Sequence, residues 1–219
     1  MPEVSYSRGA ALSVTIAGEL LLLLIACVWV YFAHIDLAPL IKFHGGTEIP
    51  LLMPGIATAG LVSLGNLAIM YFADKYHDRN MLLASMKDLI DTVMLPLLGP
   101  FTLLDSVIVA AISGLAEEVF FRGVLQNQFT ALVSFFGLHQ HQSECGIVLS
   151  AVCFGMAHFR NLYFLPYAVW AMVVGLLMSF LLAQTGSLYT PMIAHALINL
   201  TSITVLRTMY AAEQETKVE

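Results

Sequence analysis

Two adjacent glutamates and an arginine interrupt one of the most apolar stretches of this sequence, in the run EEVFFRG at residues 117–123. An ionised side chain at the centre of a membrane helix costs about 2.5 to 3.5 kcal/mol, so a charge kept there indicates function. Glu118 and Arg122 are four residues apart, which predicts an ion pair on one helix face. Glu117 points about 100° away from this face and is free for another interaction or for reaction, although spacing alone does not decide which glutamate reacts.

Two histidines and an asparagine lie in apolar runs further along the chain. His158 ends one run, and His195 and Asn199 lie four residues apart in the last one, so they share a helix face. A carboxylate and a histidine beside one water can share its proton as general base. A second histidine with an asparagine offers N–H donors for an oxyanion, each worth about 3 to 4 kcal/mol. These residue types predict hydrolysis by an activated water.

Each polar group also has a purely structural explanation, as a helix clamp or a satisfied core donor. Together they are harder to explain by packing, because a buried polar group costs free energy unless it is paired. Ser113 and Gly114 lie one turn before the glutamates, and their small size leaves space for a neighbouring helix, a water or a substrate backbone. We therefore expect the charged helix to line a functional site.

Patterns typical of metal centres are weak. His139 and His141 lie in a polar connector without a cysteine or carboxylate at ligand spacing, the sequence has no HExxH motif, and its three cysteines show no CxxC spacing. We expect neither a metal nor another cofactor. A metal-dependent intramembrane protease with Glu117, His158 and His195 as ligands is an alternative. A metal content near zero in active protein would eliminate it.

The composition predicts a membrane protein. Of 219 residues, 59% are hydrophobic and 11% charged, against about 25% charged in soluble domains, and the mean hydropathy is +0.83. This length fits one all-α domain over residues 1–219, a polytopic bundle of about six spans in the lipid bilayer. The net charge of −6 argues against nucleic acid as a partner. The small, acidic, loop-poor chain points to a prokaryotic inner membrane.

The spans that would hold the polar groups lie in the second half of the chain. Helices are expected from about residue 101 toward 136, and over about 147–158, 162–184 and 188–210, after two earlier spans at about 10–33 and 51–73. Residues 89–98 are expected to form a short interfacial or re-entrant helix, because prolines would break a longer one. Glu19, near the start of the first span, is expected to contact headgroups or another helix rather than to react.

Three motifs add a family resemblance. EEVFFRG at 117–123 contains EExxxR, FGMAH at 154–158 contains FxxxH, and HALIN at 195–199 contains HxxxN. In type, order and separation these resemble the motifs of the CPBP family, also called Abi proteins, which comprises CAAX prenyl proteases and bacteriocin-processing enzymes. The resemblance covers about residues 103–206. It implies an intramembrane glutamic endopeptidase without a metal.

The resemblance also implies roles for the motif residues. Glu117 would activate the water with His158, His195 and Asn199 would form the oxyanion site, and Glu118 with Arg122 would support it. The substrate would be a membrane-anchored or C-terminally processed protein or peptide: a prenylated CAAX end, a sorting-signal tail or a bacteriocin leader. Because members of such a family need not all be active, a non-catalytic membrane scaffold or bacteriocin-immunity protein is the other alternative.

Overall fold

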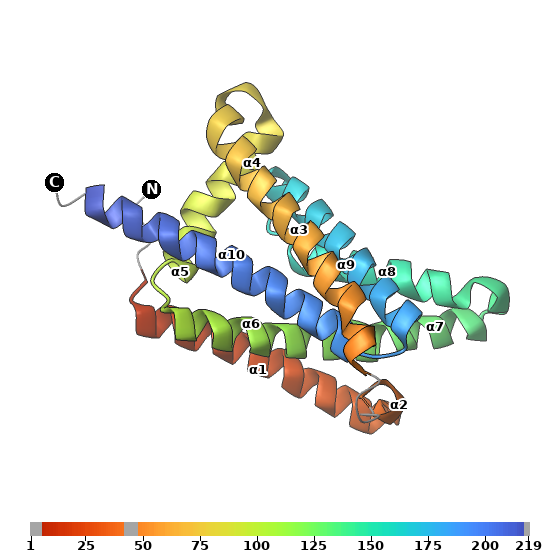
Figure 1. Ribbon diagram of the computed structural model, residues 1–219. Coiled ribbons are helices and arrows are strands. Elements are labelled where there is room, and N and C mark those ends of the chain that lie inside the picture. The colour runs from red at the N-terminus through yellow and green to blue at the C-terminus, as the bar shows by residue number, and fades with distance from the viewer. Residues whose placement is uncertain (1–5, 42–47, 217–219) are drawn as a thin grey trace.

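The computed structural model describes residues 6–41 and 48–216, and all regular structure in them is helical (Figure 1). This confirms the predicted all-α class. The helices are α1 (Arg8–Ala33), α2 (Ala38–Ile41), α3 (Glu48–Tyr76), α4 (Met81–Leu89), α5 (Leu95–Leu98), α6 (Leu103–Glu118), α7 (Gln126–Phe135), α8 (Gln142–Ala157), α9 (Leu165–Thr185) and α10 (Tyr189–Thr216). Two π-helical segments join neighbours: η2 (Ile90–Met94) joins α4 to α5, and η3 (Val119–Leu125) joins α6 to α7.

Four helical segments in the described part of the chain are long and apolar enough to cross a membrane: Arg8–Ala33, Leu51–Arg79, Leu162–Thr185 and Tyr189–Thr216. A fifth span results if the bent pair Met81–Leu98 and Leu103–Phe135 counts as one. The structure thus has four or five candidate spans where about six were expected. One reason is α8, whose 16 residues extend about 24 Å, less than the roughly 30 Å of a hydrocarbon core.

The helix expected at residues 89–98 begins earlier, at Met81, and continues through Pro96. Asn80 caps its start by accepting a hydrogen bond from the Leu82 N–H at 2.8 Å. The π-helical segment η2 changes the backbone register just before the proline: the N–H of Leu95 donates to the carbonyl of Ile90, five residues back. The chain then bends by 108° into α6, which agrees with a broken span or a re-entrant segment.

The helix that carries the glutamates begins at Leu103, two residues after the expected start. Thr102 and Asp105 form a capping box, in which the Thr102 hydroxyl accepts from the Asp105 N–H and the Asp105 carboxylate accepts from the Thr102 N–H. Asp105 also accepts two hydrogen bonds from the Arg8 guanidinium, at 2.6 and 2.9 Å. The start of α1 is thereby tied to the start of α6.

We expect replacement of Asp105 by alanine to lower the free energy of unfolding by about 1 to 3 kcal/mol, because both the cap and the ion pair are lost. Arg8→Ala is the matched control. The Arg8 side chain is 54% exposed and the Thr102 contacts remain, so Arg8→Ala should cost clearly less than Asp105→Ala. Unfolding of both variants in detergent micelles measures the difference, and equal losses would contradict it.

Helix α10 crosses the middle of the molecule and packs against α6 and α3, while α1 lies along α6 and α8 along α9 (Figure 1). Glycines set two of the close approaches. A Cβ added at Gly114 would lie 2.8 Å from the Met192 carbonyl oxygen, and one added at Gly55 would lie 2.6 Å from that of Thr190. Only glycine permits backbones this close. The glutamate-bearing helix is therefore pressed against the helix that carries His195 and Asn199.

Candidate active site

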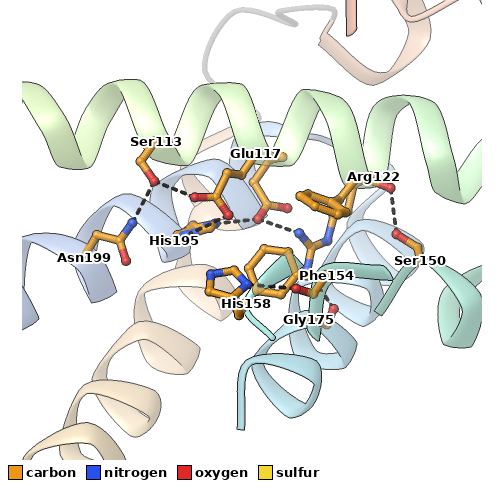
Figure 2. Close-up of polar contacts among 11 residues, drawn as sticks. Ser113, Glu117, Arg122, Ser150, Phe154, His158, Gly175, His195 and Asn199 are labelled. Carbon is orange, nitrogen blue, oxygen red and sulfur yellow. Dashed lines mark hydrogen bonds and ion pairs between the residues drawn. The ribbon is translucent and has the colours of Figure 1, made fainter. Parts of the chain in front are cut away.

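Glu118 and Arg122 form the predicted ion pair, completely buried. The Arg122 Nη1 donates to Glu118 Oε1 at 3.0 Å, and neither side chain has any exposed surface. The second terminal nitrogen of Arg122 donates to the Gly175 carbonyl at 2.9 Å, and the guanidinium lies 4.6 Å from the Phe154 ring centroid (Figure 2). Arg122 thus links η3 to α8 and α9 as well as neutralising the carboxylate.

His195 also binds Glu118. Its Nδ1 lies 2.7 Å from Glu118 Oε1, and because a carboxylate oxygen accepts, Nδ1 is the donor. The other ring nitrogen, Nε2, lies 4.0 Å from Glu117 Oε2. Because Nδ1 already carries a proton, Nε2 can donate only when the His195 ring is doubly protonated. The ring lies between Glu118 and Glu117. This contact between α6 and α10 could not be predicted from sequence spacing.

Glu117 is the accessible member of the glutamate pair. Its side chain keeps 14% of its surface exposed, whereas Glu118 has none. Glu117 Oε1 accepts from the Ser113 hydroxyl at 2.9 Å, and Ser113 Oγ in turn accepts from Asn199 Nδ2 at 2.9 Å (Figure 2). Sequence spacing left open which glutamate could reach a water, and of the two only Glu117 has exposed surface.

His158 lies at the C-terminal end of α8 as its C-cap residue. Its Nδ1 is 2.8 Å from the Phe154 carbonyl oxygen, so Nδ1 donates, and in the neutral ring Nε2 is the nitrogen with the lone pair. The Phe154 ring packs against both histidines, with centroids 4.7 Å from His158 and 5.8 Å from His195. Phe154 was part of a motif in the sequence, and the structure shows that its ring contacts both histidines.

One cavity of about 410 Å³ brings the predicted residues together: Glu117, His158, His195 and Asn199 all line it. Its walls come from α1, α3, α4, α5, α6, α8, α9 and α10 and from η2, and much of the surface is leucine, isoleucine and methionine. The described lining residues include no lysine or arginine. The cavity can therefore hold a mainly apolar group next to the carboxylate and the histidines.

Glu19 is a further lining residue. It was expected to contact headgroups or another helix, and it faces the cavity together with Thr15, one turn earlier on α1, near groups on α6 and α10. Its carboxylate interacts electrostatically with Glu117 and His195. The spacing of Thr15 and Glu19, two polar residues four apart in an apolar span, is a signal that could have identified an inward-facing stripe.

The residues that the structure describes contain no group of three or more His, Cys, Asp or Glu side chains arranged to hold a metal ion. Glu117, His158 and His195 are thus not part of such a group in the described residues. Their hydrogen bonds instead arrange one carboxylate and two imidazoles around a common space. This arrangement suits proton transfer and oxyanion stabilisation.

The comparison with protein families matches residues 99–201 to the family described as type II CAAX prenyl endopeptidase Rce1-like. This part of the chain belongs to the Rce1-like family. The matched range contains all three motifs, so the resemblance noted from them is confirmed. No curated protein and no solved structure matches the chain. The Rce1-like domain begins at the bend before α6 and ends within α10, so α1, with Glu19, lies outside it.

Proposed function

We propose that this protein is an intramembrane endopeptidase that hydrolyses a peptide bond of a membrane-associated protein or peptide with a water activated by Glu117 and His158, without a metal. Membership of a family of CAAX prenyl endopeptidases supports peptidase chemistry. The observation that carries the mechanism is that an accessible glutamate and a histidine with a free Nε2 line the same cavity. Both groups can accept a proton from one water.

In the proposed reaction the water gives its proton to this pair while its oxygen attacks the carbonyl carbon of the scissile bond. The carbonyl π electrons move to the oxygen, and the resulting oxyanion accepts hydrogen bonds from His195 Nε2–H and the second amide hydrogen of Asn199. The oxyanion then re-forms the C=O bond as the C–N bond breaks, and the stored proton passes to the leaving amine. A carboxylic acid and an amine result, and the acid then loses its proton to become a carboxylate.

Glu118 and Arg122 would act by positioning His195. Glu118 accepts from His195 Nδ1 at 2.7 Å, and its negative charge favours the doubly protonated ring that the oxyanion requires. Arg122 offsets the cost of keeping Glu118 ionised in a fully buried place. The ion pair is thus proposed as support for the oxyanion site.

The substrate classes that we propose are those processed near a membrane: a prenylated CAAX end, a sorting-signal tail or a leader peptide. The mainly apolar lining of the cavity supports a substrate with an apolar segment. The multi-pass helical structure supports a location in a membrane, which we propose is a prokaryotic plasma membrane. Because α1 supplies part of the cavity wall, we also propose that residues 1–219 act as one domain.

The proposal is tested with purified protein in liposomes that contain one membrane-anchored peptide of each class, including a farnesylated CAAX peptide. We expect mass spectrometry to show cleavage at a single bond of at least one class, with the rate unchanged by EDTA or phenanthroline. Activity that chelators abolish and Zn²⁺ restores would support the metal-dependent alternative. Failure of folded protein to cleave any of the three classes would support the scaffold or immunity alternative.

A further inference from the structure

Ser113 occupies a central place in the hydrogen-bond network, although its sequence position suggested only a small residue beside a helix contact. Its side chain is buried, with 3% of the residue exposed, and it lines the cavity. Its hydroxyl lies 2.9 Å from Glu117 Oε1 on its own helix and 2.9 Å from Asn199 Nδ2 on α10 (Figure 2). One atom therefore contacts two of the groups to which we assign the chemistry.

The chemistry of these three groups determines the direction of both hydrogen bonds. A hydroxyl has one proton and two lone pairs, an ionised carboxylate only accepts, and an amide nitrogen only donates. Asn199 therefore donates to Ser113, and Ser113 donates to Glu117. The chain of bonds has one direction and ends on the carboxylate.

We propose that Ser113 is a positioning residue that aligns Glu117 with Asn199, an inference that rests on the proposed function. Because Ser113 occupies Glu117 Oε1, the other oxygen, Oε2, is the one turned toward His195 Nε2 at 4.0 Å. Because one Nδ2 hydrogen of Asn199 is committed to Ser113, the second is available for the oxyanion. A single hydroxyl thus sets the relative orientation of the water-activating carboxylate and an oxyanion donor.

The backbone supports this role. Next to Ser113, Gly114 allows α6 to approach α10 so closely that a Cβ there would lie 3.0 Å from the Ala196 nitrogen. At this separation the short serine side chain reaches from α6 to Asn199 on α10. The close helix approach and the hydroxyl together hold both reacting groups in place.

The test compares Ser113→Ala with Ser106→Ala in the liposome assay. Ser106 lies two turns earlier on the same helix, is 0% exposed, and donates to the Thr102 carbonyl at 2.9 Å, away from the cavity lining. We expect Ser113→Ala to lower kcat about 10- to 100-fold with KM within about twofold, as for lost positioning groups. Ser106→Ala should leave both constants within about twofold. Equal effects of the two substitutions would overturn the proposal.

Two further variants separate hydrogen bonding from packing. Ser113→Cys keeps the volume but offers only a weak donor, so its kcat should fall nearly as far as that of the alanine variant, and full activity would overturn the proposal. In a cycle with Asn199→Ala, the double variant should lose less than the product of the single losses. If the kcat losses of the two single variants simply multiply in the double variant, the proposal is also overturned. The proposed function fails on other results, namely no cleavage by wild-type protein, activity that chelators abolish, or an active Glu117→Gln variant, so the two failures are distinguishable.

Discussion

Replacement of Glu117 by glutamine should reduce peptide cleavage by at least about 10²- to 10⁴-fold, the contribution usual for general acid–base catalysis. Glutamine has nearly the same shape, and its carbonyl oxygen can still accept from Ser113, which lies 2.9 Å from Glu117 Oε1. It cannot take a proton from water. The fold should therefore survive while the chemistry stops, as measured by initial rates in liposomes beside the circular dichroism and elution volume of the purified variant.

Glu144→Gln is the matched control. It removes the same charge elsewhere, because Glu144 is exposed near the start of α8. Its rate should stay within about twofold of wild type. His158→Ala should resemble Glu117→Gln, and the double variant should be little slower than either single one if both groups act on the same water. A Glu117→Gln rate within tenfold of wild type would exclude this glutamate as the base.

Replacement of Arg122 by methionine should lower the free energy of unfolding by about 3 to 5 kcal/mol, because it leaves Glu118 as an uncompensated charge in a fully buried place. Neither side chain has exposed surface, so water cannot replace the lost contact. Denaturant or thermal unfolding in detergent measures the loss. The variant should also lose its hydrogen bond to the Gly175 carbonyl, which loosens η3 from α9.

The double variant Arg122→Met with Glu118→Leu should recover most of the stability, since a buried pair is often replaceable by apolar residues. It should stay inactive, because His195 Nδ1 then has no carboxylate partner. Lys87→Met is the control: Lys87 pairs with Asp91 at the same four-residue spacing, but both side chains are partly exposed, at 22% and 40%, so about 1 kcal/mol or less is expected. A similar loss for Lys87 and Arg122 would contradict the argument from burial.

Contacts within one helix were the predictable part of the site. The Glu118–Arg122 pair follows from a spacing of four residues, and the all-α class follows from composition. The hydrogen bonds from His195 to Glu118 and from Asn199 to Ser113 join residues 77 and 86 positions apart, and only the close packing of α6 on α10 creates them. Whether Glu19 meets headgroups or another helix could not be predicted for the same reason, because its orientation depends on which face of α1 meets α6.

Helix limits were predicted less well than helix type. The helix expected at residues 89–98 begins eight residues earlier, at Met81, and η2 changes its hydrogen-bond register before Pro96. The helix expected at about residues 147–158 begins earlier, as α8, yet its 16 residues are too few for a full span. The motifs, by contrast, identified the family through residues 99–201, because they depend on residue types and not on helix ends.

The π-helical segment η3 follows Glu118 directly, and there the N–H of Gln126 donates to the Phe121 carbonyl five residues back. That carbonyl also accepts from Ser150 on α8 at 2.7 Å. A π turn amounts to one residue more than an α turn holds. Deleting a single residue from this segment would return it to α register, because the amide five places on would become the amide four places on and could still donate to the same carbonyl. Helix α7 would then keep the face that it turns to α8, whereas a deletion within α6 would rotate everything after it by about 100°.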